Sequence, residues 1–310
     1  MERIEQLGAW PVRALWAALA LLSGPTFADA LDHRSAAVQL LVAVVLWAGW
    51  AAALVALLVP RSASLTATRV LVPAGLAAVA WGAALGSPSG LDVVALVVAA
   101  AAAALVLSPW FAEAWVDGSA YGPEQRTPLR TPPLLALVVA PATWGVIVAG
   151  ALAGPLLLAA RAWVVGGILV VVGWPLAFAG VRSLHQLARR WVVLVPAGLV
   201  VHDPLTMPEP QLFLKASIRR VGPAEDPDSI AGPAVTIEGD VGGRAIVTED
   251  LTAGAAGLAL ELVLDEPVDL LVRRKGRGNN ETLAVDRVLF TPSRPAVVLE
   301  GAKARKILVG

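Results

Sequence analysis

The chain has 310 residues, of which 57% are hydrophobic and only 15% are charged, and its formal net charge is zero. Soluble domains usually carry about 25% charged residues, so this composition is typical of a membrane protein, and the balanced charge gives no indication of nucleic-acid binding. Cysteine is absent, which excludes disulfides, thiol catalysis and thiolate metal sites.

Charged residues are scarce in the first part of the chain and normal in the second. Nine basic and eight acidic residues precede Ser183, whereas fifteen basic and sixteen acidic residues lie from that position onward. Ten of the eleven Trp residues also precede Ser183, as expected if Trp rings anchor helix ends at a membrane interface. We therefore predict a transmembrane helical domain over residues 1–183 and a cytosolic domain over residues 184–310.

Six apolar runs in the first domain are long enough for membrane-spanning helices, because a hydrocarbon core about 30 Å thick needs ~20 apolar helical residues. The runs are Trp10–Ala30, Ala37–Val59, Arg69–Leu85, Leu91–Leu107, Leu134–Gly154 and Ala162–Val181. The third and fourth are short and are joined by a turn-rich linker, residues 86–90, that suits a tight helical hairpin.

The first run has two interpretations. Pro25 interrupts it, and residues 28–30 resemble a small-x-small site for signal peptidase. A secretory signal has a positively charged N-terminal region, whereas Glu2 and Glu5 offset the arginines here. We therefore favour a retained span; cleavage would leave five spans and would not alter the orientation of the rest.

Arginines in the loops predict the orientation of the spans. With six spans, one side of the membrane receives only Arg34 and Arg161, and the other receives Arg3, Arg13, Arg61, Arg69, Arg126, Arg130, Arg182, Arg189 and Arg190. Because short loops rich in Arg and Lys stay in the cytoplasm, we predict a multi-pass protein of the cytoplasmic (plasma) membrane with both termini in the cytosol.

The centres of spans two to six carry no charged residue and no His. Ionisable groups in the bilayer mark proton relays and ion paths, so this pattern argues against a proton-coupled pump without excluding a passive pore. We interpret the prolines of the spans as packing kinks rather than as breaks around a substrate site. The pairs Gly82–Gly86 and Gly150–Gly154 would allow close helix approach, within one chain rather than in a dimer.

The segment Ser108–Pro133 is the longest between two spans. Glu113 and Asp117 are four residues apart and could share a helix face, but no His, Ser nucleophile or metal ligand accompanies them. We interpret the segment as a solvated loop at the membrane interface, on the same side as the cytosolic domain and able to touch it.

After Arg182 the pattern changes from helical to strand-like, with Ser183–Arg190 extending the last helix. The predicted strands are Trp191–Val195, Leu199–Asp203, Gln211–Lys215, Ser217–Val221, Ala234–Glu238, Arg244–Thr248, Leu258–Leu264, Val268–Arg273 and Val285–Phe290. Hairpin turns are predicted at residues 239–243 and 265–267, and Pro223–Gly232 is predicted to be a surface loop. A helix over Ser293–Lys306, capped by Ser293, would close a small, bent sheet or barrel.

The sequence from Arg189 to Asp203, RRWVVLVPAGLVVHD, resembles the opening hairpin of bacterial pleckstrin-homology-like domains, which in membrane-tethered versions directly follows a transmembrane helix. The stretch Val288–Pro292 and the helix after it fit the same plan. The chain thus resembles actinobacterial multi-pass membrane proteins with such a domain at the C-terminus. This resemblance implies a module for binding or assembly rather than an enzyme, and it supplies no catalytic residues.

The strongest candidate site is the basic run Arg273, Arg274, Lys275 and Arg277, next to a predicted strand end. Cations near a membrane surface contribute about 1 kcal/mol each to binding anionic headgroups. The alternative, which we favour, is a solvated turn that keeps an edge strand from aggregating. Further candidates are Arg219 and Arg220, and the pair Arg189 and Arg190, which we interpret as the cytosolic anchor of the last span.

No other constellation predicts chemistry. His202 and Asp203 are neighbours on a predicted strand, so their side chains should point to opposite faces. The three His residues lack metal-ligand spacing, and no phosphate loop or nucleophile elbow occurs. We therefore expect no catalytic residues, cofactor or metal, and predict a non-enzymatic membrane protein that presents a binding or scaffolding module to a protein partner or lipid, in cell-envelope organisation. The alternative is a small-molecule transporter or channel with a cytosolic regulatory domain.

Overall fold

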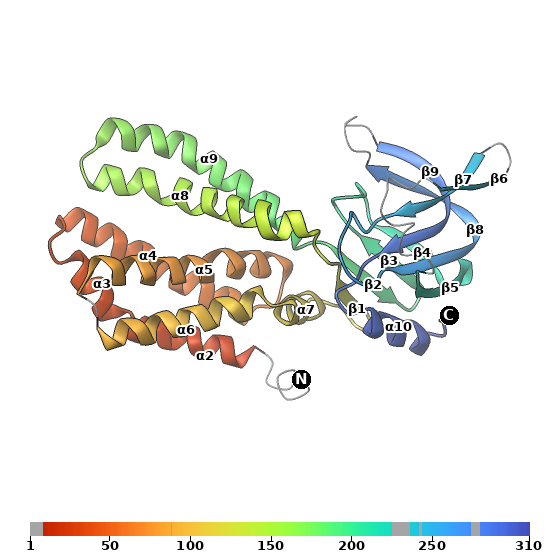
Figure 1. Ribbon diagram of the computed structural model, residues 1–310, viewed down its shortest axis with the longest axis horizontal. Coiled ribbons are helices and arrows are strands. Elements are labelled where there is room, and N and C mark those ends of the chain that lie inside the picture. Colours follow the sequence, from red (N-terminus) through yellow and green to blue (C-terminus); the bar gives the residue numbers. More distant parts are fainter. Residues whose placement is uncertain (1–8, 88, 225–235, 242–243, 274–279) are drawn as a thin grey trace. The chain divides into compact units, whose positions relative to one another are not determined.

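The computed structural model describes residues 9–87, 89–224, 236–241, 244–273 and 280–310, with the backbone alone for residues 236–241 and 244–246. The chain divides into two compact units. Met1–Gly118 and Pro141–Ala188 form one, which we name the helical unit, and Ser119–Ala140 and Arg189–Gly310 form the other, which we name the β unit. Figure 1 shows helices in the first and mostly strands in the second.

Within the described residues, six helical stretches are long and apolar enough to cross a membrane. They are α2 (Trp10–Leu22) with α3 (Gly24–Leu31), α4 (Ala36–Leu58), α5 (Ser62–Leu85), α6 (Gly90–Leu107), the π-helical turn η1 (Leu135–Val139) with α8 (Ala140–Ala159), and α9 (Trp163–Leu187). The predicted multi-pass architecture is confirmed. The first stretch bends at Ser23, immediately before the Gly24-Pro25 pair that opens α3.

The sequence predicted a short third span that begins at Arg69, and this is wrong. Helix α5 begins at Ser62, seven residues earlier. Arg69 therefore lies inside a helix and not in a loop. Its Nε atom donates to the backbone carbonyl of Val106 on α6 at 3.5 Å. A long apolar stem and a hydrogen-bonded head let arginine remain within an apolar helix.

Glycines allow close helix contacts inside the helical unit. A Cβ atom added at Gly150 of α8 would lie 2.6 Å from the carbonyl oxygen of Gly173 on α9, and one added at Gly154 would lie 2.6 Å from Val170. Similarly, Gly82 of α5 faces Phe27 of α3. The predicted intramolecular use of these glycine pairs is confirmed.

Several Trp residues join helices rather than anchoring helix ends, contrary to the prediction. Trp16 of α2 donates its indole N–H to the carbonyl of Trp50 on α4 at 3.0 Å, and Trp50 donates in return to the carbonyl of Trp16 at 2.9 Å. Trp144 of α8 donates to the carbonyl of Val70 on α5 at 3.0 Å. An indole N–H needs such a partner when it is buried among apolar groups, and a neighbouring backbone carbonyl supplies it.

The predicted solvated loop Ser108–Pro133 is largely folded, and that interpretation is wrong. Its first part is helix α7 (Pro109–Asp117), which begins with Ser108 as a cap and Pro at the first helical position. Phe111 and Trp115 of α7 are buried, and their rings stack with centroids 3.9 Å apart. The loop also contains strand β1 (Gln125–Pro128), which belongs to the β unit.

Two sheets form the β unit. The first has the order β1-β2-β3-β4 and is antiparallel throughout, with β2 at Trp191–Val195, β3 at Gly198–His202 and β4 at Gln211–Leu214. The second has the order β5-β8-β9-β7-β6, with β5 at Ile218–Pro223, β6 at Thr236–Val241, β7 at Arg244–Asp250, β8 at Leu260–Arg273 and β9 at Asn280–Phe290. Strands β7 and β9 pair in parallel and the other neighbours are antiparallel.

The predicted hairpin at residues 265–267 is absent, because β8 runs without a turn from Leu260 to Arg273. Its pairing with β9 shifts register between Val263 and Val268. An irregularity there accommodates Pro267, which cannot donate a hydrogen bond to a sheet ladder. The other predicted hairpin, β6 with β7, is present, although β6 continues to Val241. Most of the predicted loop Pro223–Gly232 lies outside the described residues.

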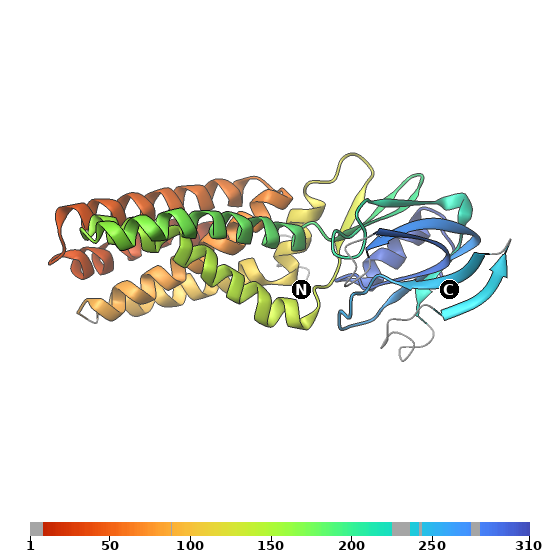
Figure 2. The same cartoon turned by 90° about the horizontal axis from the view of Figure 1, so that it is seen from above.

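One apolar core lies between the two sheets and helix α10 (Pro295–Ala304). Its members include Leu194 of β2, Phe213 of β4, Leu262 of β8 and Val298 of α10. Helix α10 packs against β2 and β5. In Figure 2 it is the blue helix next to the strands. The predicted closing helix is thus confirmed, although its N-cap is Arg294 and not Ser293.

Candidate functional site

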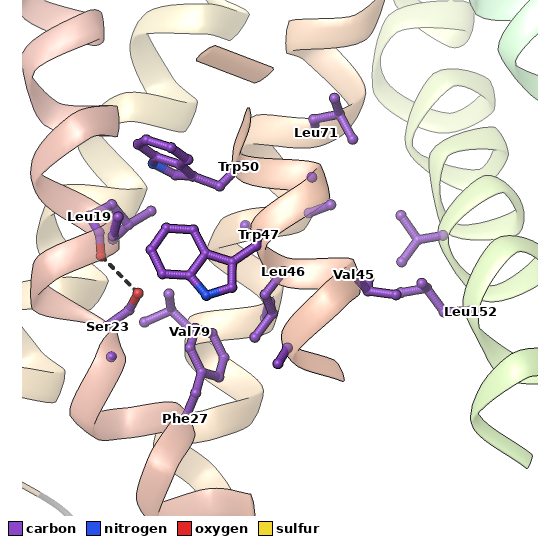
Figure 3. Close-up of a pocket in the computed structure, with 18 of the residues that line it drawn as sticks. Leu19, Ser23, Phe27, Val45, Leu46, Trp47, Trp50, Leu71, Val79 and Leu152 are labelled. Atoms are coloured by element: carbon purple, nitrogen blue, oxygen red, sulfur yellow. Dashed lines mark hydrogen bonds between the residues drawn. The ribbon is translucent and has the colours of Figure 1, made fainter. Parts of the chain in front are cut away.

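A cavity of about 630 Å³ lies within the helical unit. Helices α2, α3, α4, α5 and α8 supply its lining (Figure 3). Small-molecule sites in proteins are usually concave, mostly apolar and roughly 300–1,000 Å³ in volume. The cavity therefore has the size of a ligand site.

Aromatic rings form one wall of this cavity. Trp47 and Trp50 of α4 meet edge to face with centroids 5.7 Å apart, and Trp16 and Phe27 complete the aromatic part of the lining. In Figure 3 the Trp47 ring lies near Leu19, Ser23 and Val79. Because Trp16 and Trp50 donate their N–H groups to each other's backbone, they offer a ligand only their carbon faces.

Small side chains create the space. Ala20, Ala43, Ala74, Ala78 and Ala151 all line the cavity. An Ala side chain fills little volume, so helix faces rich in Ala leave space that larger side chains would occupy. Sequence reasoning missed the cavity because Ala and Gly are abundant throughout these spans and do not mark one place.

Polar side chains line the cavity at Ser23, Asp32 and Gln39. The Ser23 hydroxyl donates to the carbonyl of Leu19 at 2.7 Å, the bond drawn in Figure 3. The Gln39 amide nitrogen donates to the carbonyls of Leu31 at 3.0 Å and Arg34 at 3.2 Å. The amide oxygen of Gln39 and the carboxylate of Asp32 are acceptors, so this end of the cavity suits a ligand group that donates hydrogen bonds.

Nearby carboxylates hold the ends of helices together. Asp92 of α6 accepts from the Thr26 hydroxyl at 2.5 Å and from the backbone N–H of Ser89 at 2.8 Å, which caps α6 and ties it to α3. Asp29 accepts from the backbone N–H of Ser87 at 2.5 Å. Both carboxylates therefore have a structural role, because each accepts hydrogen bonds that fix the end of a helix.

Of the predicted basic site, the structure describes only Arg273, at the end of β8; Arg274, Lys275 and Arg277 lie outside the described residues. The Arg273 backbone N–H donates to the carbonyl of Thr206 at 2.7 Å, and the residue is exposed. Arg189 lies 3.4 Å from the His202 ring, whereas Arg219 and Arg220 are in ion pairs. Arg219 binds Asp265 at 3.0 Å, and Arg220 binds Glu261 at 2.7 Å.

Of the pair Arg189 and Arg190, predicted to anchor the last span, Arg190 is buried inside the β unit, so the prediction is wrong for this residue. Its Nε and one terminal nitrogen each donate to the Asp203 carboxylate at 2.7 Å, and its other terminal nitrogen donates to the carbonyl of Arg130 at 2.9 Å. The two side chains are only 1% and 0% exposed. Asp203 also accepts from the backbone N–H of Leu205 at 3.0 Å. This buried pair joins β2, the end of β3 and the segment after β1.

His202 and Asp203 do not cooperate, as predicted. The His202 ring stacks on Trp191 at 4.9 Å, and its Nδ1 atom donates to the carbonyl of Arg189 at 2.5 Å, whereas Asp203 binds Arg190. Burial lowers the pKa of His202 below its ordinary value, although that hydrogen bond opposes the shift.

The strand β1 is a part of the β unit that sequence reasoning did not identify. It pairs with β2 from Gln125 opposite Leu194 to Pro128 opposite Trp191. Arg126 lies over the Trp191 ring at 6.0 Å and binds Glu124 at 2.9 Å, which lowers the pKa of that carboxyl. Beyond the strand, Leu129 enters the core. The four residues of β1 show no alternation of apolar and polar side chains, so no local signal marks them as a strand.

No group of three or more His, Asp or Glu residues able to hold a metal ion occurs in the part of the chain that the structure describes. His185 contacts Thr66 at 3.0 Å, and exposed His33 lies 4.0 Å from Asp32, so the three His residues occupy three different settings. Comparison of the chain with protein-family models, with curated proteins and with solved structures gave no match.

Proposed function

We propose that this protein is a non-enzymatic, multi-pass protein of a bacterial cytoplasmic membrane that presents a binding or scaffolding module to the cytosol. The β unit is that module, of the pleckstrin-homology-like type, and its ligand is a protein partner or an anionic lipid. Organisation of the cell envelope is the process that this design suits, because a module held at the inner membrane surface can recruit cytosolic partners there.

The construction of the β unit carries this proposal. Its first sheet combines β1, from between two membrane helices, with β2, which follows the last one. The chain therefore passes between the two units at three places, after Gly118, Ala140 and Ala188. Three connections keep the module near the bilayer at high effective concentration, so weak binding to a membrane-associated partner becomes productive.

Two further features support a pleckstrin-homology-like identity. The hairpin of β2 and β3 directly follows the long apolar helix α9, as in the membrane-tethered domains that the sequence resembles. The two sheets and helix α10 also share one core. An enclosed apolar core leaves surface loops and sheet edges as the elements available for binding a partner.

Pairing of β1 with β2 puts residues 125–128 and the chain after α9 on one side of the membrane. The arginine asymmetry predicts that this side is the cytosol. Single cysteines can test this without background, since the native chain has none. We expect a membrane-impermeant maleimide to label His33→Cys in intact cells, and Leu214→Cys, which is 52% exposed on β4, only after lysis. Labelling of Leu214→Cys in intact cells would contradict the orientation.

Vesicle flotation tests whether the basic run is a lipid site. The probe is the soluble β unit, with residues 119–131 joined by a flexible linker to residues 189–310. We expect it to float with anionic vesicles at low salt and to be released at physiological salt, where the screening length is about 8 Å. Changing Arg273, Arg274, Lys275 and Arg277 to Ser should abolish flotation.

A control variant, Lys303→Ser with Lys306→Asn, removes two exposed cations near the C-terminal end of the β unit and should still float. Its unfolding midpoint, and that of the Ser variant, should stay near that of the unchanged module, because exposed charges contribute little to stability. If the Ser variant floats as well as the unchanged module, the lipid ligand is refuted and a protein partner remains.

One observation favours the second candidate function, a small-molecule transporter or channel with a cytosolic regulatory domain. The helical unit contains a cavity of ligand size. Its lining is mostly apolar, so a polar solute would find few hydrogen-bonding partners there. On this alternative the cargo is hydrophobic.

A further inference from the structure

The cavity of the helical unit reaches the surface that faces lipid. Leu40, Val44 and Trp47 follow one another on α4 at intervals of four and three residues and therefore share a face of that helix. They are 67%, 56% and 60% exposed, as expected for side chains in contact with the bilayer. Trp47 also lines the cavity, so the cavity and the lipid-facing surface meet at this residue.

The cavity has the depth of one leaflet of a membrane. Gln39, near the start of α4, and Trp50 both line it. Eleven residues of α-helix span about 16 Å, and the hydrocarbon core of a bilayer is about 30 Å thick. The cavity therefore extends along α4 for about the length of one lipid acyl chain.

The cavity is polar at one end and apolar along the rest of its length, as a lipid has a polar headgroup and an apolar acyl chain. Its polar residues Asp32 and Gln39 lie where the turn after α3 leads into α4, at the end of the spans. Deeper along α4 the lining consists of apolar and Trp side chains, and the indole N–H groups of Trp16 and Trp50 are already bonded to protein. A water molecule would make few hydrogen bonds in this part of the cavity, because an ordered water needs two or more polar partners.

From this placement we infer that the cavity binds one acyl chain of a membrane lipid. The chain enters from the bilayer past Trp47, and the lipid's polar end lies at Asp32 and Gln39, in the leaflet next to the turn between α3 and α4. The hydrogen-bond acceptors at that end select a lipid whose polar part includes hydroxyl or amine donors. This site is separate from the binding surface proposed for the β unit.

Native mass spectrometry and photo-crosslinking test the site on the full chain. The protein is reconstituted with phosphatidylethanolamine that carries a diazirine near the end of one acyl chain, and labelled peptides are mapped. We expect one lipid to remain on each chain after detergent extraction, and labels to concentrate on α4 and α5. Ala78→Phe, which fills the cavity from α5, should lower both signals about tenfold, the effect of excluding two buried methylene groups.

Control variants separate the cavity from ordinary contact with bulk lipid. Ala77 is next to Ala78 but is exposed and does not line the cavity, so Ala77→Phe should bind and label like the unchanged protein. Ala151→Phe on α8 fills the cavity from another helix, and Ala149→Phe, exposed on the same helix, is its control. Thermal unfolding shows whether each variant folds. If Ala78→Phe does not fold, Ala151→Phe and its control test the cavity in its place.

Loss of the retained lipid and of the α4 and α5 labels in the cavity variants alone supports the inference. Equal retention and labelling in folded cavity variants and their controls would overturn it. Labels spread evenly over all exposed helix faces of the unchanged protein, with no lipid retained, would show bulk lipid contact only and would also overturn it.

Discussion

Replacing Arg190 by Ala is expected to destabilise the β unit by about 3–5 kcal/mol, the usual cost of removing one partner of a buried ion pair. The change leaves the Asp203 carboxylate, which is 0% exposed, without its countercharge. It also removes the donor that binds the carbonyl of Arg130. Urea unfolding of the soluble β unit, followed by fluorescence of Trp191, its single Trp residue, measures the effect.

Two comparisons isolate the buried pair. Arg190→Met with Asp203→Leu removes both charges and should cost much less than Arg190→Ala, because no unpaired charge stays buried. Arg219→Ala breaks an ion pair of similar length, 3.0 Å, whose partners are 60% and 50% exposed, and should cost about 0–1 kcal/mol. If Arg190→Ala costs no more than Arg219→Ala, the buried pair does not stabilise the unit.

The second large effect concerns β1. From the sequence alone, residues 184–310 would be expected to fold without the membrane domain. The structure instead places β1 on β2 and Leu129 in the core. Burying one Leu side chain contributes about 1.5–3 kcal/mol, and a domain is stable by only about 5–15 kcal/mol. We therefore expect a fragment of residues 189–310 to be poorly folded and prone to aggregate through the uncovered edge of β2.

The fragment that also carries residues 119–131 on a flexible linker should fold. Amide dispersion in NMR spectra distinguishes the two fragments. A third fragment, in which a Gly-Ser stretch of equal length replaces residues 125–129, controls for the added chain and should behave like the fragment of residues 189–310. A well-dispersed spectrum from residues 189–310 alone would show that β1 is not needed for folding.

Local patterns in the sequence were sufficient for most elements of the fold. The six apolar stretches were predicted because ~20 apolar residues suit a membrane whatever their neighbours are. Strand β2 was predicted with its observed bounds, Trp191–Val195, and the Pro-Ala-Gly turn after it located β3 within one residue. Helix α10 was predicted from its spacing of apolar residues and from Ser293 as a candidate cap.

Errors arose where pairing overrides local pattern. Residues 265–267 look like a turn, yet β8 continues through them, and β9 pairs with it before and after this stretch, from Leu260 to Val263 and from Val268 to Arg273. The segment Ser108–Pro133 looks solvated because of its charges, yet α7 buries Phe111 and Trp115, and β1 completes a sheet. Edge pairing of a short strand depends on a partner more than 60 residues away, which a local window does not contain.

Composition and periodicity by themselves determined that this chain has six apolar helices, a normally charged second half rich in strands, and a closing helix. Only the tertiary structure decided which polar groups meet and where space remains. Arg190 looks like a membrane anchor until Asp203, thirteen residues away, is found against it. The cavity is lined by alanines of several helices together with Trp47 and Trp50, and such an arrangement follows from packing rather than from any local pattern.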